Sequence, residues 1–448
     1  MKQAYKRWVC GLLAACAVLL AACAAVVYFV DPCLYYRIPE DWDPVLFSER
    51  YQAAGLAKNV PADTVLMGTS LAANYRRSEI AETFGTTAVR ITIPDGYLSE
   101  FDKTMDVLFR SQDPQRVIFG LDANILVRDE SGLTSAMPDY LYNGNPFDDV
   151  KYLINKDTLY YSAYVPMANR WDEADTLDEG FTWDGDVWWN HATALANYTR
   201  PEITGETLPA DTYLRHASDN LDVVEGWITA HPETEFDIFF PPYSILFWDK
   251  TAPLGETEAV FAALDLACER LLQYDNVRLY NFLMDPDIVL DLDNYCDYVH
   301  HSGAVCTQVL AKMVAGECRM TEENYRDTLA QWRDFVVDYD YEKYWDDISP
   351  FIKYGCLKDT KFCDKMNDYI LFKNLDDKYL TLPELLVKEE EKKEDADAAS
   401  DVVDKDGNSV TEDADAKDDS EEEKDERKVI YYVTDKVQQG QYIKLFKE

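Results

Sequence analysis

The distribution of apolar residues separates an N-terminal hydrophobic run from a long region in which short apolar stretches alternate with amphipathic ones. The run from Trp8 to Val30 is 23 residues long and carries no charge. A helix of that length crosses the ~30 Å hydrocarbon core of a bilayer. Lys2, Lys6 and Arg7 precede the run. The positive-inside rule therefore predicts a single-pass anchor in the cell membrane, with a cytoplasmic N-terminus and everything after residue 31 outside.

A cleaved signal peptide is the alternative interpretation of residues 1–31. Its apolar core usually runs about 7–15 residues, which is shorter than this one. Leu20-Ala-Ala-Cys23 also resembles a lipoprotein cleavage box. The chain remains apolar from Ala24 to Val30, however, where a mature lipoprotein normally turns polar. The sequence therefore favours an uncleaved transmembrane helix.

Beyond the anchor, short apolar segments alternate with helical patterns. The segments expected to form strands are 65–67, 88–93, 116–121, 235–240 and 276–280. Helical patterns cover 98–110, 220–230 and 256–273. Strands separated by helices favour a parallel sheet that is covered on both faces. The expected fold class is therefore α/β, in a domain that spans 32–338.

Two stretches of this domain do not follow the alternation. Residues 31–62 form a connection that contains several prolines, and we expect it to separate the domain from the membrane surface. Residues 128–216 form an insertion rich in aromatic residues, among them Tyr140, Tyr142, Tyr160, Tyr161, Trp171, Trp183, Trp188 and Trp189. The insertion is either a subdomain with its own small core or a cap whose rings stack on sugars over a neighbouring cleft. Asn197-Tyr-Thr199 is a glycosylation sequon, a pattern of low information.

The charge balance limits the classes of partner. The 448 residues include 43 basic and 84 acidic ones, for a net charge of −41. Nucleic-acid binding through phosphate contacts is therefore not expected. The ten cysteines and five histidines show no metal-ligand spacing, so the sequence predicts neither a metal site nor another cofactor. Cys296 with Cys306, and Cys356 with Cys363, stay open as disulfide pairs.

The candidate chemistry lies in two short blocks. Gly68-Thr69-Ser70 breaks the first strand before an apolar-periodic segment, and a strand–turn–helix unit presents a side chain at the carboxyl edge of a sheet. Ser70 is therefore a candidate nucleophile, although a serine there can also simply cap the helix. Asp297 stands three residues before His300, so on a helical turn the two would share a face. The aspartate would then orient the imidazole, with His301 as a competitor for the role of base.

In these two blocks the chain resembles the SGNH/GDSL hydrolase family, over roughly residues 40–338, and most of all its membrane-anchored, DltD-like branch. The resemblance implies a flavodoxin-like three-layer sandwich. It also implies Ser70 as nucleophile, His300 as base and Asp297 as the group that orients His300. The family's oxyanion hole would use the Ser70 amide, the Gly96 amide and an asparagine side chain.

The third family block departs from the pattern. After the third expected strand, Asp122 stands where the asparagine is expected, in Gly120-Leu-Asp122-Ala-Asn124. An ionised carboxylate at this point would repel an oxyanion. Asn124 can take over the role from two residues further on, or Asp122 can orient other groups. Tyr243 and Ser244 end the fourth expected strand at the same edge, so we expect them to line the cleft or only to stop the strand.

The resemblance implies an extracytoplasmic esterase or acyltransferase that acts on a cell-envelope polymer. Members of the anchored branch commonly work beside a membrane-bound O-acyltransferase, so such a partner is expected. A catalytically inactive envelope-binding protein on the same fold is the alternative, favoured by Asp122.

The C-terminal region differs from the preceding domain in its sequence pattern. Residues 339–448 resemble a late middle-domain fragment of HtpG-type chaperones, in Tyr341–Asp359, Lys378–Glu384, Val429–Asp435 and Gln441–Glu448. The family's ATP-binding domain has no counterpart here, so no ATP site is carried over. Residues 388–427 hold 19 acidic and 7 basic residues and predict a disordered segment inside a small α/β fragment. A chaperone-related fusion or a gene-assembly artefact without ATPase activity is the third interpretation.

Overall fold

The computed structural model describes residues 2–129, 137–203, 205–339, 371–373 and 379–381. The α-helices are α1 (Lys2–Val30), α2 (Glu49–Asn59), α3 (Arg77–Phe84), α4 (Leu98–Ser111), α5 (Ala123–Leu126), α6 (Val150–Leu153), α7 (Lys156–Trp171), α8 (His191–Ala196), α9 (Leu214–Ala230), α10 (Ile245–Thr251), α11 (Thr257–Leu271), α12 (Pro286–Val289), α13 (Gly303–Ala315) and α14 (Tyr325–Val337). The 3-10 helices are η1 (Ser70–Ala72), η2 (Asp139–Leu141), η3 (Phe282–Met284) and η4 (Leu292–Asn294). The strands are β1 (Thr64–Gly68), β2 (Ala88–Thr92), β3 (Arg116–Gly120), β4 (Glu235–Phe240), β5 (Val277–Asn281), β6 (Arg319–Met320), β7 (Leu371–Lys373) and β8 (Tyr379–Thr381).

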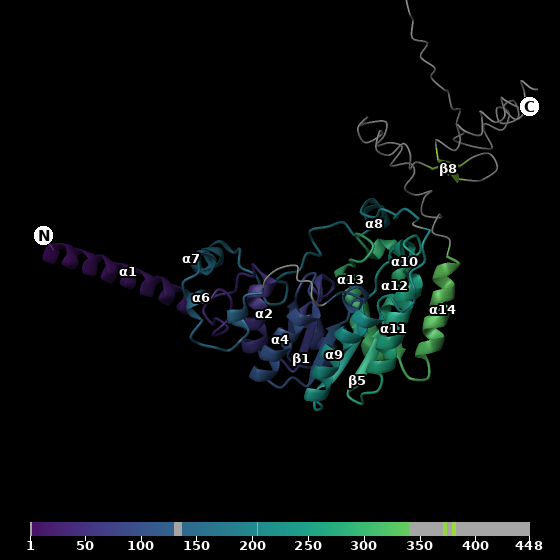
Figure 1. Cartoon of the computed structure of the whole chain (residues 1–448), viewed down its shortest axis with the longest axis horizontal. Helices are drawn as coiled ribbons and strands as arrows, with labels where there is room; N and C mark the ends of the chain where they lie inside the picture. Colours follow the sequence, from purple (N-terminus) through teal and green to yellow (C-terminus); the bar gives the residue numbers. More distant parts are fainter. Residues whose placement is uncertain (1, 130–136, 204, 340–370, 374–378, 382–448) are drawn as a thin grey trace, which may run out of the picture. The chain divides into compact units, whose positions relative to one another are not determined.

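A six-stranded, mostly parallel sheet forms the centre of the domain (Figure 1). The strand order is β2-β1-β3-β4-β5-β6, and β1 to β5 are parallel. The predicted α/β class is therefore confirmed. β6 was not predicted: it pairs antiparallel with β5 and is only two residues long, which is too short to leave a periodic pattern.

The two faces of the sheet are covered by different helices. Alternate residues of a strand point to opposite faces, and along β1 Val65 and Met67 join one apolar cluster whereas Leu66 joins another. The first cluster includes buried residues of α2, α4, α9 and α11, and the second includes residues of α3 and α13. The parallel strands are buried over almost their whole length, as a sheet covered on both faces requires.

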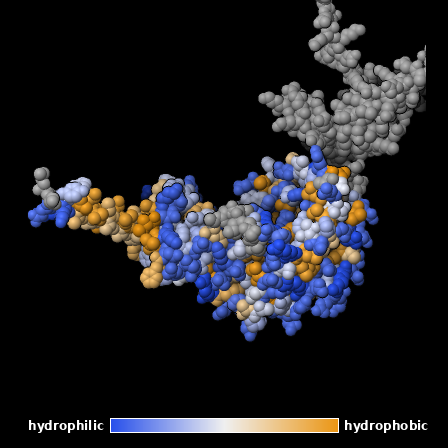
Figure 2. All heavy atoms as spheres, viewed as in Figure 1, coloured by the Kyte–Doolittle hydropathy of each residue, from blue (hydrophilic) through white to orange (hydrophobic). Residues whose placement is uncertain are grey.

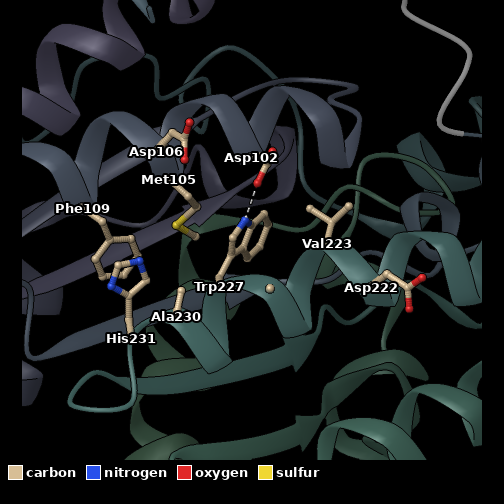
Figure 3. A pocket seen from close by; sticks show the side chains of 10 residues that line it. Asp102, Met105, Asp106, Phe109, Asp222, Val223, Trp227, Ala230 and His231 are labelled. Atoms are coloured by element: carbon tan, nitrogen blue, oxygen red, sulfur yellow. Dashed lines mark hydrogen bonds between the residues drawn. The ribbon is translucent and has the colours of Figure 1, made fainter. Parts of the chain in front are cut away.

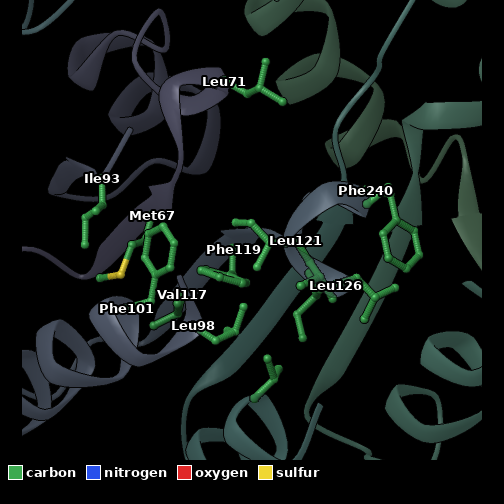
Figure 4. Close-up of a cluster of buried hydrophobic side chains, with 14 of the residues drawn as sticks. Met67, Leu71, Ile93, Leu98, Phe101, Val117, Phe119, Leu121, Leu126 and Phe240 are labelled. Carbon is green, nitrogen blue, oxygen red and sulfur yellow. The ribbon is translucent and has the colours of Figure 1, made fainter. Parts of the chain in front are cut away.

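The larger cluster fixes α4 against the middle of the sheet (Figure 4). Phe101 on α4 meets Phe119 on β3 edge to face, with ring centroids 5.3 Å apart. Trp227 on α9 meets the same phenylalanine ring at 5.3 Å. Aromatic pairs in this arrangement add about 0.5–1.5 kcal/mol beyond the burial of their surface. The ring of Phe119 thus joins two helices to one strand.

The N-terminal helix α1 is a candidate membrane span, since it is long and apolar enough over Gln3–Val30. Most of its side chains are exposed, but Val27 near its end is fully buried. Asp31 follows with a positive φ of 52°, and its carboxylate accepts hydrogen bonds from the backbone amides of Tyr35, Tyr36 and Arg37. The C-terminal end of α1 is therefore packed against the domain and held there by hydrogen bonds.

The C-terminal interpretations concern residues that lie almost wholly outside the described part of the chain. The HtpG-like fragment at 339–448 and its acidic segment at 388–427 stay predictions, because only the short strands β7 and β8 are described there. Cys356 and Cys363 also lie outside it. Cys296 and Cys306 are both described, buried and free of a disulfide.

The buried side chain of Gln52 is expected to stabilise the segment between α1 and β1. Its amide donates to the carbonyls of Pro32 and Val45, and its oxygen accepts from the amides of Phe47 and Ser48, at 2.9 to 3.2 Å. Gln52→Leu should lower the free energy of unfolding by about 2–4 kcal/mol, because each buried polar group left without a partner costs about 1–3 kcal/mol. Chemical denaturation of the full-length protein in detergent measures it.

The matched control is Gln273→Leu. Gln273 is exposed and donates one hydrogen bond to the Glu269 carbonyl, at 3.0 Å. This change should alter the free energy of unfolding by no more than about 0.5 kcal/mol. Equal losses for the two variants would contradict the role assigned to Gln52.

Candidate active site

Ser70 lies in a tight turn at the carboxyl end of β1. β1 is flanked on both sides by parallel strands, and Thr69 joins it to η1, which begins at Ser70. The turn is narrow, since a Cβ added to Gly68 would lie 3.0 Å from the Cβ of Ala72. The backbone therefore folds η1 directly over the end of the strand and leaves Ser70 partly exposed.

The structure brings Ser70, His300 and Asp297 into one hydrogen-bonded chain. Ser70 Oγ lies 2.9 Å from His300 Nε2, and His300 Nδ1 lies 2.7 Å from Asp297 Oδ2. Because Nδ1 faces a carboxylate, we assign the imidazole proton to Nδ1, which leaves Nε2 free to accept the proton of the serine. The arrangement can therefore activate Ser70 as a nucleophile.

The carboxylate of Asp297 is held in place by its own loop. Its Oδ1 accepts hydrogen bonds from the amides of Val299 and His300, at 2.8 and 2.7 Å. Burial raises the pKa of Asp297, but the hydrogen bonds and the charge of His300 outweigh it and leave the pKa below its usual value. The expected helical turn is not found at 297–300: the carboxylate bonds to its own backbone amides instead, which is a local alternative to a helix.

His301, the competitor for the role of base, is directed away from the serine. It is 1% exposed, and its Nδ1 lies 3.4 Å from the Ser302 carbonyl and 3.7 Å from Cys306 Sγ. Burial lowers the pKa of His301 to about 4, so the ring is neutral at physiological pH. His301 is thus part of the core beneath the loop.

Part of the aromatic insertion borders the triad. The Trp183 ring meets the His300 ring edge to face, with centroids 5.2 Å apart, and Trp183 also contacts Trp189 at 5.2 Å. Asn74, four residues after Ser70, accepts hydrogen bonds from Thr182 Oγ1 and the Trp183 amide at 3.1 Å. These contacts join segments about 110 residues apart, and the sequence pattern gives no signal for them.

Further contacts fix the insertion to the loop that carries His300. The Asp184 carboxylate accepts a hydrogen bond from the Gly303 amide at 2.6 Å, at the start of α13. The side chain of Asn197 donates to the Cys296 carbonyl at 2.9 Å. The side-chain amide of the sequon is therefore already engaged by the protein.

Asp122 lies beside the triad, buried under the turn. Its Oδ2 accepts a hydrogen bond from Thr69 Oγ1 at 2.5 Å, and the side chain is 4% exposed. Burial raises the pKa of Asp122 to about 6, although hydrogen bonds from Thr69 and Tyr243 and the charge of His300 act in the opposite direction. The group is therefore ionised above about pH 6 and neutral below it.

The three expected oxyanion donors differ in their surroundings. The Ser70 amide belongs to the first turn of η1, where amides lack a partner within the helix. The Gly96 amide donates to the Ile93 carbonyl at 3.0 Å and is thus engaged in a turn. Asn124 has an exposed side chain at the start of α5. Of the three expected donors, the amide of Ser70 and the side chain of Asn124 therefore remain available to an oxyanion.

Tyr243 and Ser244, expected to line the cleft, are buried behind the site. They are 1% and 0% exposed, respectively. The Tyr243 hydroxyl accepts a long hydrogen bond from the Asn124 amide at 3.5 Å. Ser244 donates through both its amide and its hydroxyl to the Tyr298 carbonyl, at 3.1 and 3.0 Å. Ser244 therefore supports the loop between Asp297 and His300.

One cavity among the described residues, of about 260 Å³, lies between α4 and α9 and contains the hydrogen bond from Trp227 Nε1 to Asp102 Oδ1, at 2.8 Å (Figure 3). Phe109 and His231 stack at its end, where the helices lead into the starts of β3 and β4. That end is the sheet edge opposite to Ser70, so this cavity does not serve the triad.

A second cavity, about 200 Å³, lies close to the triad. Its lining includes Asn74, Thr182, Asp184 and Gly303, the residues that connect the insertion to the segments around Ser70 and His300. Its surface is polar, with Arg76 and Glu79 contributed by the chain that follows η1. In the part of the chain that the structure describes, no group of three or more histidine, cysteine, aspartate or glutamate residues is arranged to hold a metal ion.

Comparison with protein-family models and with curated protein sequences finds no match for this chain.

The buried carboxyl of Asp122 predicts a pH-dependent cost to the fold. A carboxyl whose pKa rises from 3.8 to about 6 on folding favours the native state fully below pH 3.8, and the benefit is lost as the pH rises through 6. Asp122→Asn keeps an acceptor for Thr69 but cannot ionise. At pH 8 it should raise the free energy of unfolding by up to about 3 kcal/mol relative to wild type, since one pKa unit corresponds to about 1.36 kcal/mol. The gain should shrink towards pH 4.

Chemical denaturation at a series of pH values measures this difference. Asp334→Asn on α14 removes the same charge from an exposed position and serves as the control. A difference between Asp122→Asn and wild type that stays constant from pH 4 to 8 would contradict the raised pKa.

Proposed function

We propose that the protein is a membrane-anchored, extracytoplasmic esterase or O-acyltransferase that works through a Ser70-His300-Asp297 triad. The observation that carries the proposal is the continuous hydrogen-bonded chain from Ser70 Oγ through His300 to Asp297, at 2.9 and 2.7 Å. A serine–histidine contact of this length at the carboxyl edge of a parallel sheet fits acyl transfer better than structural roles for both groups.

In the proposed reaction Ser70 Oγ attacks the acyl carbonyl carbon while His300 Nε2 takes the hydroxyl proton. Asp297 stabilises the imidazolium that forms. The proton then passes to the leaving alcohol, and the acyl group stays on Ser70 as an ester. In the second half His300 deprotonates water or an acceptor hydroxyl, which attacks the ester, and the proton returns to Ser70 Oγ. Transfer to water gives an esterase and transfer to a polymer hydroxyl gives an acyltransferase.

The developing oxyanion needs donors, and the Ser70 amide and the Asn124 side chain are the proposed ones. Both belong to short helical turns that directly follow strands β1 and β3, which are adjacent in the sheet. Gly96 joins them only if its turn to Ile93 opens.

The fold supports the SGNH-like assignment. The order 2-1-3-4-5 of the parallel strands is typical of flavodoxin-like folds, in which helices cover both faces of the sheet. The domain at 32–338 is the proposed three-layer sandwich, with 128–216 as its insertion. Fold likeness alone does not determine activity, so the triad geometry remains the main argument.

The proposed substrate is an ester of a cell-envelope polymer, with a membrane-bound O-acyltransferase as the proposed partner. The apolar helix α1 and the basic residues in its first two turns support a domain held on the outer side of the membrane. The polar cavity beside the triad suits hydroxyl-rich substrates, since Asn74, Thr182 and Asp184 line it.

A fluorophosphonate probe tests the nucleophile. Wild-type protein should be labelled, and Ser70→Ala should abolish the labelling because the variant lacks the hydroxyl that lies 2.9 Å from His300 Nε2. Asp297→Asn should slow labelling by about four orders of magnitude, the scale of this substitution in serine proteases. Ser111→Ala, at an exposed position on α4, is the control and should label as wild type does.

A catalytically inactive envelope-binding protein on the same fold is the second candidate, favoured by the buried carboxylate of Asp122 beside the triad. Asp122→Asn distinguishes the two. If the carboxylate hinders the oxyanion, this variant should react at pH 8 about tenfold faster or more, since one oxyanion donor is worth about 10²–10³. At pH 5, where Asp122 is neutral, the gain should be much smaller.

The labelling rates of wild type and Asp122→Asn give three outcomes. An unreactive wild type with a reactive variant would favour the binding protein, and a reactive wild type favours the enzyme. Equal rates at both pH values would remove Asp122 from either argument. The chaperone-related interpretation rests on residues outside the described part of the chain and receives no support from the site.

A further inference from the structure

The helix α7 leaves several of its large apolar and aromatic side chains exposed. Its fully buried side chains are the small or medium-sized ones of Thr158, Ser162, Val165 and Ala168, each at most 2% exposed. Its outer side carries Tyr160 at 62%, Met167 at 43% and Trp171 at 56% exposure. Surface helices of soluble proteins normally bury their large apolar side chains and expose their polar ones.

The neighbouring helix α6 adds to the same apolar surface. Phe147, just before it, is 90% exposed, and Val150 and Ile154 are 51% and 44% exposed. We call these six side chains the apolar collar: Phe147, Val150, Ile154, Tyr160, Met167 and Trp171. Large exposed apolar side chains on or beside two helices that contact each other are a sign of a contact surface.

The apolar collar belongs to the part of the domain that holds the end of α1. Both α6 and α7 contact α1. Val165 and Ala168 of α7 pack in one cluster with Val30, the last residue of α1. Tyr152 on α6 donates a hydrogen bond to Asp31 at 2.7 Å.

Two further tyrosines complete the junction. The hydroxyls of Tyr35 and Tyr36 both bond to the Asp149 carboxylate, at 3.3 and 3.0 Å. Figure 2 shows apolar surface running along α1 up to this junction. The collar therefore lies where the chain would leave the bilayer.

We propose that α6 and α7 lie in the interfacial region of the membrane that α1 spans, with the apolar collar inserted among the lipids. The composition fits this occupant: tyrosine and tryptophan concentrate at the level of the headgroups. Lys151, Lys156 and Arg170 flank the apolar side chains, and long basic side chains reach back to the water while their stems stay in apolar surroundings. The continuity with α1 favours lipid over a protein partner as the occupant.

This arrangement gives the anchor a second point of contact. The apolar length of a single spanning helix does not set its tilt or rotation in the bilayer, and a domain fixed to its end shares both. With α7 in the interface, the orientation of the sheet relative to the bilayer is fixed. The inference does not depend on the chemistry of Ser70.

Tryptophan fluorescence in lipid nanodiscs tests the proposal with the full-length protein. Wild type, Trp171→Phe and Trp188→Phe are each placed in nanodiscs of ordinary and of brominated phosphatidylcholine. The difference in emission between wild type and each variant gives the emission of the substituted tryptophan. Quenching of Trp8, which lies in α1, is the same in both proteins and drops out of this difference. Trp188 is the matched control, since it is 80% exposed and lies outside α6 and α7.

We expect brominated lipid to remove most of the Trp171 emission and to leave the Trp188 emission unchanged. Equal Trp171 emission in the two lipids would overturn the proposal. In that case, quenching of Trp171 by iodide dissolved in the water identifies what covers the apolar collar in place of lipid. Protection of Trp171 from iodide would point to a second copy or another protein on the apolar collar. Full quenching by iodide would mean that the surface is free in water. Equal quenching of both tryptophans would also overturn it, because the contact would then not be specific to α7.

Discussion

The candidate site depends on the Asp297 carboxylate and the three hydrogen bonds that it accepts. Two come from the backbone amides of Val299 and His300 and fold the loop, and the third comes from His300 Nδ1 and orients the ring. A single side chain thus determines both the path of the loop and the direction of Nε2. Because the three donors hold one carboxylate, a change in the loop would also change the distance from His300 to Ser70.

The loop cannot hold this geometry alone, since residues 295–302 contain no regular helix or strand beyond one bridge between Tyr295 and His301. Neighbouring segments supply the missing support. Ser244 bonds to the carbonyl of Tyr298, and Asn74 connects the turn after Ser70 to the insertion and to the His301 carbonyl. A site built in this way is preorganised by contacts between distant parts of the chain, which is what acyl transfer requires of its catalytic groups.

Local patterns were enough to predict the five parallel strands and the end of the sheet at which Ser70 lies, but neither the short edge strand β6 nor the groups that support the site. Short apolar runs located β1 to β5, and the strand–turn–helix pattern directed attention to Ser70. Tyr243 and Ser244 do follow β4, yet strand position says nothing about burial, and both lie behind the cleft. Asn74 was not predicted, and Trp183 was named only as one aromatic residue of an insertion that could cap the cleft, because the contact of each depends on a partner roughly a hundred residues away. The helical turn expected at Asp297 is replaced by side-chain bonds to the backbone, a competition that spacing alone cannot reveal.

The insertion after β3 links the two ends of the domain that matter for the proposed function. Its first helices hold the end of α1 through Tyr152 and Val165, and its later residues place Trp183 against His300. Arg90 on β2, which is 7% exposed, donates hydrogen bonds to the carbonyls of Gly180 and Tyr75 and so fixes the middle of the same insertion to the sheet. Burying a guanidinium is costly unless its donors are paired, and here the two carbonyls pair with it. The insertion is therefore held at both ends and in its middle. One continuous segment thus sets both the orientation of α1 and the position of the Trp183 ring beside His300.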